Sequence, residues 1–297
     1  MTRTIRQPRK NERGAYLFIL PFVLMFAVFK LYPMVYGFWV SFLDRNSIKK
    51  LTSSTFVGLQ NYLKVLKSST FWQTLGHTFT FALVYTVFVM FFGYLFGVLF
   101  NRKFKGRTVV RTMFYMPYVT NMIAVGIVFK YLLNPTKGPI NAIFRVFGLE
   151  GPKWLTSPTM ALPVTAVIGG WVALAFNIIT VLAAMQDIPN ELYEVADIEG
   201  ATFGQKLRYV ITPMLMPTLF MLLTITLINS FKSYTTIVGL TSGGPGTSSR
   251  TLSLQIYEDA FTYMKFGIAS AEGVIFTGII ILVNKVFTKV RTEWEKR

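Results

Sequence analysis

Two long stretches without a charged side chain constrain this chain more than any other feature of its sequence. Neither Ser68–Asn101 nor Trp154–Gln186 contains an Asp, Glu, Lys or Arg residue. A helix of about 20 apolar residues crosses the hydrocarbon core of a bilayer, and both stretches are longer than that. Only 14% of the 297 residues are charged, against about a quarter in soluble domains. These observations predict an all-α polytopic membrane protein.

Hydropathy divides the chain into six predicted transmembrane helices. The expected spans are residues 15–42, 77–100, 112–133, 159–185, 209–238 and 266–287. They make a membrane domain over 15–289, between a basic tail at 1–14 and a second tail at 290–297. The first apolar run is too long for the core of a cleavable signal peptide, and no small-residue cleavage site follows it. We therefore expect it to be retained as the first helix.

The distribution of Lys and Arg predicts the orientation. The N-terminal tail, the second loop and the C-terminal segment from Lys285 to Arg297 each carry five basic residues. The positive-inside rule therefore places both termini in the cytoplasm. A basic first loop, with Arg45, Lys49 and Lys50, reduces this asymmetry without reversing it. The net charge of +17 is thus attributed to membrane orientation and not to nucleic-acid binding.

Composition excludes several kinds of chemistry. The chain has no cysteine and a single histidine, His77, so thiolate sites, cysteine nucleophiles and histidine metal clusters are excluded. No Gly-Lys-Ser or Gly-Lys-Thr sequence is present, although a phosphate-binding loop would need one. We expect no catalytic residue, no metal and no cofactor on this chain. A secondary transporter is disfavoured because only Glu272 could serve as a carboxylate within the spans.

The loop after the fourth predicted span is unusually long and acidic for a cytoplasmic connection. It covers residues 187–208 and begins with Pro189-Asn190 and acidic residues, which suits the start of a helix. Gly200 and Gly204 would allow a sharp turn before the next span. The segment is either a solvated amphipathic connector or a short helix that docks into the groove of a cytoplasmic partner.

At these residues the sequence resembles the signature of binding-protein-dependent ABC importer permeases. That signature reads E-A-A, three residues, G, nine residues, then I-x-L-P. Glu194-Val195-Ala196, Gly200 and Val210-Ile211-Thr212-Pro213 keep the spacing, with mild departures at Val195, Val210 and Thr212. Three further elements resemble the loops of carbohydrate permeases: F-V-G-L-Q-N-Y at 56–62, T-S-G-G-P at 241–245 and Y-E-D-A-F at 257–261.

The resemblance implies the six-helix type I ABC importer permease fold, in a bacterial cytoplasmic membrane. It implies a subunit that moves a sugar or oligosaccharide and is not itself an enzyme. The implied partners are a second homologous permease, two copies of an ATPase that binds ATP and Mg²⁺, an extracellular solute-binding protein and membrane lipids. An amino-acid or peptide importer is the alternative. The residues implied to couple to the ATPase are Glu191, Glu194, Ala196, Asp197, Gly200, Ala201 and Gly204.

Polar and aromatic residues in and beside the predicted spans are candidates for a substrate pathway. They are Tyr118, Asn121, Asn177, Asn229, Ser230, Lys232, Tyr234 and Glu272. Polar groups in membrane helices often mark a pathway, but each also suits an interhelical hydrogen bond. Neutral amides, hydroxyls and tyrosine rings suit an uncharged sugar. Lys232 and Glu272 would pair with each other, reach the membrane boundary or meet an acidic sugar.

The second predicted span carries two glycines one helical turn apart, Gly93 and Gly97. Small residues at this spacing let two membrane helices approach closely. We therefore expect helix packing there, and no chemistry.

Overall fold

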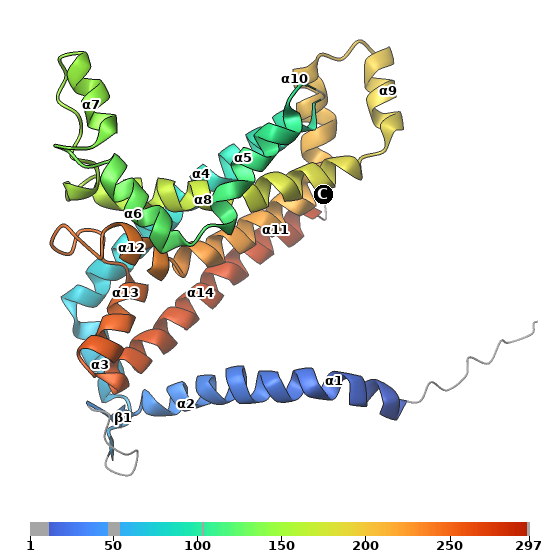
Figure 1. Ribbon diagram of the computed structural model, residues 1–297. Coiled ribbons are helices and arrows are strands. Elements are labelled where there is room, and N and C mark those ends of the chain that lie inside the picture. Colours follow the sequence, from blue (N-terminus) through green and yellow to red (C-terminus); the bar gives the residue numbers. More distant parts are fainter. Residues whose placement is uncertain (1–11, 47–53, 103, 296–297) are drawn as a thin grey trace, which may run out of the picture. The chain divides into compact units, whose positions relative to one another are not determined.

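The computed structural model describes residues 12–46, 54–102 and 104–295. Most of the predicted N-terminal tail, Lys49 and Lys50 lie outside the described residues, as do the last two residues of the C-terminal tail. The described part is mostly helical (Figure 1), which confirms the predicted fold class. It also contains an antiparallel pair of short strands, β1 (Leu43–Asp44) and β2 (Thr55–Phe56), in which Leu43 pairs with Phe56.

The chain divides into two compact units. The first runs up to Lys67 and includes Asp259–Val274, and the second comprises Ser68–Glu258 and the chain from Ile275 onward. The last helix, α14 (Phe266–Glu295), contributes to both. The other helices of the first unit are α1 (Glu12–Phe26), a π-helical turn (Ala27–Leu31), α2 (Tyr32–Val40) and α3 (Gln60–Lys67).

In the first unit, Asn61 explains the F-V-G-L-Q-N-Y element. Its Nδ2 donates to the carbonyl oxygens of Ser41 and Leu43, both at 2.9 Å, and the side chain is buried. The neighbouring Tyr62 shares a 2.6 Å hydrogen bond with the hydroxyl of Ser41. A Cβ on Gly267 would lie 2.1 Å from the Leu43 carbonyl oxygen, so only glycine fits there. The element therefore holds the chain that follows α2.

The second unit contains most of the helices. They are α4 (Ser69–Asn101), α5 (Arg107–Val119), α6 (Met122–Leu132), α7 (Pro139–Val146), α8 (Ala161–Gln186), α9 (Asn190–Ile198), α10 (Phe203–Lys206), α11 (Thr212–Phe231), α12 (Tyr234–Leu240) and α13 (Leu252–Tyr257). A 3₁₀ turn lies at Trp154–Thr156, and π-helical turns lie at Leu207–Ile211 and Glu258–Thr262.

Helices α4 and α8 pack directly against each other in the second unit. A Cβ on Gly93 would lie 2.7 Å from the Cβ of Asn177, and one on Gly97 would lie 2.5 Å from Val181 Cγ1. Real Cβ contacts are never this short, so any larger residue would push the helices apart. The close packing predicted for the two glycines is confirmed.

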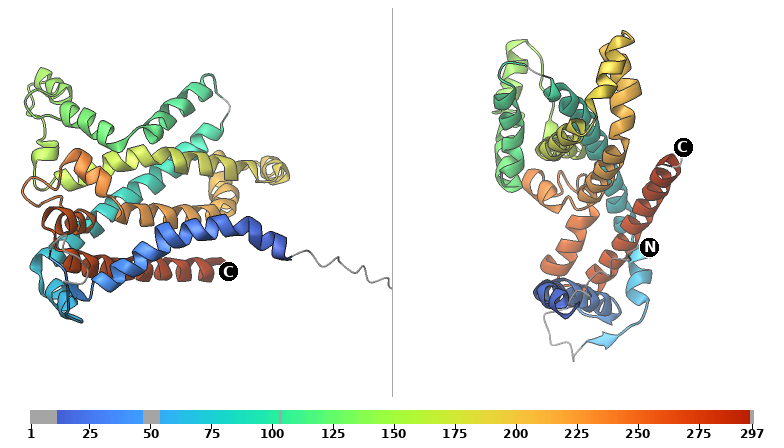
Figure 2. Two further views of the ribbon diagram at one scale, coloured as in Figure 1. Left: turned by 60° about the horizontal axis from the view of Figure 1, so that its bottom comes forward. Right: turned by 90° about the vertical axis from the view of Figure 1, so that its right-hand side faces the viewer.

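Among the described residues, five helical stretches are long and apolar enough to cross a membrane. They are Tyr16–Val40, Ser69–Asn101, Ala161–Gln186, Phe203–Phe231 and Phe266–Glu293. Helices α5 and α6 make a sixth if they count as one span, and they meet at a bend of 105° (Figure 2). The fifth predicted span was expected to continue to residue 238, but its helix ends at Phe231 and α12 follows separately.

The bend interrupts the span predicted over 112–133. Pro117 lies inside α5, where its ring lacks an N–H and disturbs the helix. The side chain of Asn121 then caps α6 by accepting a hydrogen bond from the Ile123 N–H at 2.8 Å. Asn121, one of the predicted pathway residues, is therefore the cap of the second helix at the bend.

Candidate functional site

The acidic segment after α8 folds into a helix and a glycine turn, as predicted. Helix α9 begins at Asn190, directly after Pro189. At its end the Ala201 N–H donates to the Ala196 carbonyl (2.9 Å), and the Gly200 N–H donates to the Asp197 carbonyl (3.0 Å). These two bonds are the typical way in which a helix ends when the residue just past it has a left-handed backbone conformation. Gly200 has that conformation, with φ of 71°.

A second helix starts directly after this turn. The Thr202 hydroxyl accepts from the Gln205 N–H at 3.4 Å, and Gln205 Oε1 accepts from the Thr202 N–H at 2.7 Å. This reciprocal cap satisfies two donors at the start of α10. Gly204 lies inside α10 and its φ is not left-handed. The expectation that Gly204 helps to make the turn is therefore wrong, and Gly200 is the turn glycine.

Helix α9 exposes both acidic and apolar side chains. Glu191 and Glu194 are exposed. Leu192, Val195 and Ile198 are exposed as well, and Ile198 is 86% accessible. Because these three residues recur at intervals of three, they share one side of the helix. That side is free to contact a partner.

The small and acidic residues expected on the same surface lie differently. Ala196 is buried within the chain and Ala201 is half-buried. The carboxylate of Asp197 forms an ion pair with Lys206 of α10. The expectation that Ala196 allows close approach of a partner is therefore wrong.

Two contacts join this segment to the rest of the second unit. The guanidinium carbon of Arg102, which follows α4, lies 3.7 Å from the ring centroid of Phe203 at the start of α10. The ring of Tyr193 packs against a buried cluster that includes Val98, Val181 and Ile211. Burial raises the pKa of Tyr193, and its hydroxyl has no hydrogen-bond partner among the described residues.

A small pocket in the second unit gathers polar and aromatic side chains from four helices. Its volume is about 100 Å³. It is lined by Tyr85 of α4, Tyr118 of α5, Ala173, Phe176 and Asn177 of α8, and Ile225, Thr226 and Asn229 of α11. The structure thus brings together three of the predicted pathway residues, Tyr118, Asn177 and Asn229.

The pocket lining combines a free acceptor with an aromatic surface. Asn177 is 3% exposed and donates through Nδ2 to the Thr226 hydroxyl at 3.3 Å. Its Oδ1 has no hydrogen-bond partner among the described residues. The ring of Tyr118 stacks on Phe176, with centroids 6.4 Å apart and planes 21° apart. None of the lining residues is an Asp, Glu, Lys or Arg. Such a lining can accept a hydroxyl donor and stack against an apolar ring face.

Two predicted pathway residues are used in packing near this pocket, not in its lining. Ser230 is buried, and its hydroxyl donates to the carbonyl of Leu227 at 2.6 Å. The ring of Tyr234 packs against that of Tyr257, with centroids 4.6 Å apart and planes tilted by 40°. The Ser230 hydroxyl is therefore bonded within α11, whereas Tyr234 joins α12 to α13.

Three other predicted pathway residues also lie outside the pocket lining. Asn121 caps α6 at the bend. Lys232 is exposed directly after α11. Glu272 is buried in the first unit. The pocket itself is therefore built from neutral groups.

The sequence interpretation missed Tyr85, Phe176 and Thr226. Phe176 directly precedes Asn177, and Thr226 lies one turn before Asn229, so the neighbours of the two asparagines were a usable signal. Tyr85 lies in a long apolar run and stacks on Phe81 at 5.7 Å, and no sequence pattern distinguishes it.

A larger cavity, about 390 Å³, lies between α5 and α8. Its lining is mostly apolar and includes Ile178 and Leu182, with Arg111 and Gln186 as polar members. None of the predicted pathway residues lines it. The smaller pocket is the better candidate because its polar groups converge.

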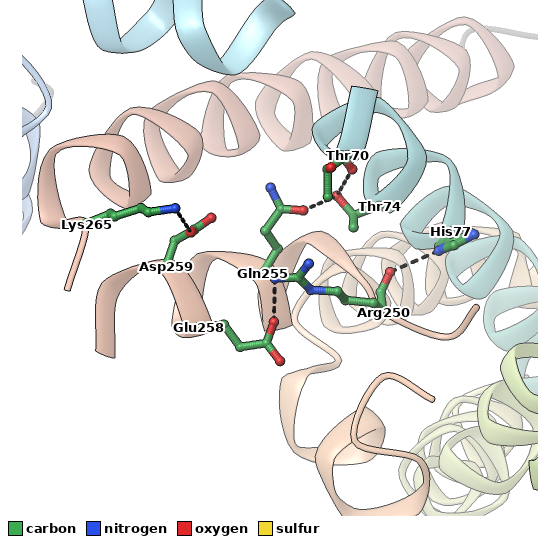
Figure 3. Close-up of polar contacts among 8 residues, drawn as sticks. All are labelled: Thr70, Thr74, His77, Arg250, Gln255, Glu258, Asp259 and Lys265. Carbon is green, nitrogen blue, oxygen red and sulfur yellow. Dashed lines mark hydrogen bonds and ion pairs between the residues drawn. The ribbon is translucent and has the colours of Figure 1, made fainter. Parts of the chain in front are cut away.

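The loop between α12 and α13 is fastened to α4 (Figure 3). The Thr74 hydroxyl donates to Gln255 Oε1 at 2.9 Å, and His77 Nδ1 donates to the Arg250 carbonyl at 3.1 Å. Arg250 in turn forms a 2.5 Å ion pair with Glu258. The loop that carries the T-S-G-G-P element is therefore held beside the start of α4.

Comparisons with known proteins agree with this arrangement. Residues 89–290 match the family described as binding-protein-dependent transport system inner membrane component. The chain is 33% identical over 273 residues to the arabinooligosaccharides transport system permease protein AraP of Halalkalibacterium halodurans, covering 91% of this chain and 84% of that protein. It is 30% identical over 284 residues to the trehalose/maltose transport system permease protein MalF of Thermococcus litoralis, covering 95% and 94%.

A solved structure shares the fold. It is the crystal structure of a bacterial ABC transporter involved in the import of the acidic polysaccharide alginate. One of its chains aligns with a TM-score of 0.84 over 96% of both chains, at 24% identity. The predicted type I permease fold is confirmed.

Proposed function

Because this chain belongs to the binding-protein-dependent transport system inner membrane components, we propose that it is the permease subunit of an ATP-driven sugar or oligosaccharide importer. The observation that carries the substrate class is the neutral pocket of Tyr85, Tyr118, Asn177 and Asn229. The names of the relatives, which concern arabinooligosaccharides and trehalose or maltose, support the same class. The membrane is the cytoplasmic membrane of a bacterium.

The pocket recognises a sugar through one hydrogen bond and one stacking surface. A sugar hydroxyl donates to Asn177 Oδ1, which otherwise has no partner among the described residues. A buried acceptor left unpaired costs about 1–3 kcal/mol, so this bond favours occupancy. The Tyr118 ring, already stacked on Phe176, meets the apolar face of the sugar. Asn229 is exposed at the pocket and contacts further hydroxyls.

Energy comes from separate subunits. Two copies of an ATPase hydrolyse ATP with Mg²⁺, and α9 docks into a groove of one of them. The apolar side of α9, with Leu192, Val195 and Ile198, fills that groove, while Glu191 and Glu194 meet basic residues at its rim. This places α9 and both chain termini in the cytoplasm, in line with the positive-inside rule.

Two further partners complete the importer. A solute-binding protein delivers the sugar from outside, which the description of the family supports. A second, homologous permease forms the other half of the pathway. The span Tyr16–Val40 supports such a partner, because its apolar window is 0% buried within the chain, and an apolar helix of this kind contacts another subunit or lipid.

Uptake by the assembled transporter tests the proposal. The chain is coexpressed with its partner subunits, and uptake of oligosaccharides is compared with uptake of amino acids. We expect the assembled transporter to take up sugar. Asn229→Leu and Asn177→Leu should each reduce this uptake at least tenfold while the subunits still assemble. Asn284→Leu, a matched change in α14 outside the pocket, should leave uptake unchanged. Parental uptake by both pocket variants would refute the site, and uptake by the chain alone in liposomes without nucleotide would refute the importer.

A further inference from the structure

The segment between α6 and α8 presents an apolar surface that the proposed transport function does not use. Ile143, Val146 and Phe147, on and directly after α7, are 60%, 82% and 74% exposed. Leu149 is exposed as well. In a helix, positions 143, 146 and 147 lie on one side. The result is a contiguous apolar side that nothing in the second unit covers.

This surface is held rigidly from behind. The buried side chain of Asn141 donates to the carbonyls of Pro135 (3.2 Å) and Pro152 (3.0 Å), and its Oδ1 accepts from Trp154 Nε1 at 2.6 Å. A Cβ on Gly151 would lie 2.4 Å from Asn141 Cγ, so the loop closes tightly around the amide. The exposed residues are therefore displayed by a fixed scaffold and do not belong to a loose loop.

The scaffold lies at the level where a membrane helix ends. Ile140 and Trp154 pack against a buried cluster that contains Val125 and Leu133, from α6 and the residue that follows it. Ile127, Val128 and Tyr131 on α6 are also exposed and apolar. The apolar surface of α6 is thus followed directly by that of α7, which lies near one end of α8 while α9 lies near the other (Figure 1).

The charge of the segment fits a lipid headgroup layer. Lys137, Arg145 and Lys153 are its basic residues, against the single acid Glu150. A helix with one apolar side and basic neighbours lies in the interface of a bilayer, where anionic headgroups attract the cations. We infer that residues 139–149 form an interfacial anchor that inserts Ile143, Val146 and Phe147 into the headgroup and acyl boundary of an anionic membrane.

Site-directed spin labelling tests the anchor directly. The chain has no cysteine, so Phe147→Cys, Val146→Cys and Lys137→Cys each give a unique labelling site in the full chain. The labelled chain is reconstituted into nanodiscs, and collisions with oxygen, which concentrates in lipid, are compared with collisions with a water-soluble nickel chelate. We expect the labels at 146 and 147 to favour oxygen several-fold over the label at 137. Agreement between 146 and 147 guards against a single variant that misfolds.

Two further comparisons identify what shields the labels at 146 and 147 from the nickel chelate. Nanodiscs of phosphatidylcholine alone are compared with nanodiscs that also contain phosphatidylglycerol, and we expect a deeper position for 147 in the anionic bilayer. Equal depth in both would overturn the anionic preference. Labels at 146 and 147 that are open to nickel in every bilayer would overturn the anchor. Protection that arises only after a solute-binding protein is added would show a protein-docking surface and would overturn it as well.

Discussion

Two short amphipathic helices, α7 and α9, lie near opposite ends of α8, and the chain fixes them by different means. Helix α7 is held by a buried side chain, Asn141, which makes three directional hydrogen bonds with residues before and after it. Helix α9 is held by a main-chain cap at Gly200 and by the contacts of Tyr193 and Phe203. The first arrangement is buried and specific, whereas the second is mostly exposed.

The difference separates two tasks. A helix that rests on a membrane surface needs a fixed height, which the network around Asn141 provides. In the proposed function α9 transmits a force from the ATPase, which requires fixed ends and an exposed outer side, and α9 has both. The charges of the two helices also differ. The α7 segment is basic, as suits anionic headgroups, whereas α9 carries Glu191, Glu194 and Asp197. The following predictions test this contrast.

The largest effect is expected for Asn141→Leu. The change leaves Trp154 Nε1 and two carbonyls without their partner, and each buried unpaired group costs about 1–3 kcal/mol. We expect the α7 segment to open, with faster proteolysis at residues 134–156 and a lower melting temperature. Lys137→Ala, an exposed change in the same loop, is the control. Proteolysis at the parental rate would mean that the network does not hold α7.

At the other end of α8, substitutions at Gly200 should affect coupling more than folding. A left-handed φ costs a residue with Cβ about 1–2 kcal/mol, and no atom lies within 4 Å of a Cβ built there. We expect co-purification of the ATPase and sugar uptake to fall least for Gly200→Asn, more for Gly200→Ala and most for Gly200→Val, because Asn tolerates the left-handed conformation best. An Asn variant as defective as the Val variant would instead indicate that a partner presses on the site.

A smaller effect is expected for the contact between Arg102 and Phe203. Cation–π pairs at exposed sites contribute about 0.5–1 kcal/mol. Arg102→Ala, Phe203→Ala and the double variant form a cycle in which the two single losses of thermal stability should not add. Sugar uptake per ATP hydrolysed should fall in the same variants, with Arg107→Ala as the exposed control. Strict additivity would show that the two residues act independently.

The smallest effect is expected for Tyr193→Phe. The change removes a buried hydroxyl that has no partner among the described residues, so the variant should be as stable as the parent or slightly more stable. Burial raises the pKa of Tyr193 above the usual value of about 10. Keeping the Tyr193 phenol neutral in the folded state therefore contributes to the free energy of unfolding in full at a pH below about 10. This contribution is lost as the pH rises through the raised pKa of the folded state. Melting temperatures of parent and variant should diverge only at alkaline pH, and parallel curves would contradict this assignment.

Features governed by local interactions could be predicted from the sequence. The start of α9 after Pro189, the turn at Gly200 and the close packing at Gly93 each depend on neighbours in the chain or on one small residue. The 105° bend between α5 and α6 could not be predicted, because hydropathy stays high across it and reports no direction. The burial of Ala196 could not be predicted either, because it depends on which side of α9 faces the cluster that Tyr193 contacts, and that cluster is built from distant residues.

The pocket was predictable only in part, for the same reason. Asn177 and Asn229 stand out because amides are rare in apolar helices, and both line the pocket. Tyr85 and Thr226 are ordinary members of their helices until folding brings α4 and α11 beside α8. Ser230, which has the same polarity, is instead hydrogen-bonded to its own helix.

The tight contact at Gly93 and Gly97 makes α4 and α8 a single rigid unit. With no room for even a methyl group between them, the helices cannot slide past each other without driving Asn177 or Val181 into the neighbouring backbone. Within this rigid unit, Tyr85 belongs to α4 and Asn177 to α8. The pocket residues Thr226 and Asn229 belong to α11, which is a separate helix. The segment that contains α9 and α10 connects α8 to α11 in the chain. In the proposed importer, a displacement of α9 moves α11 relative to the rigid unit of α4 and α8 and changes the width of the pocket between them.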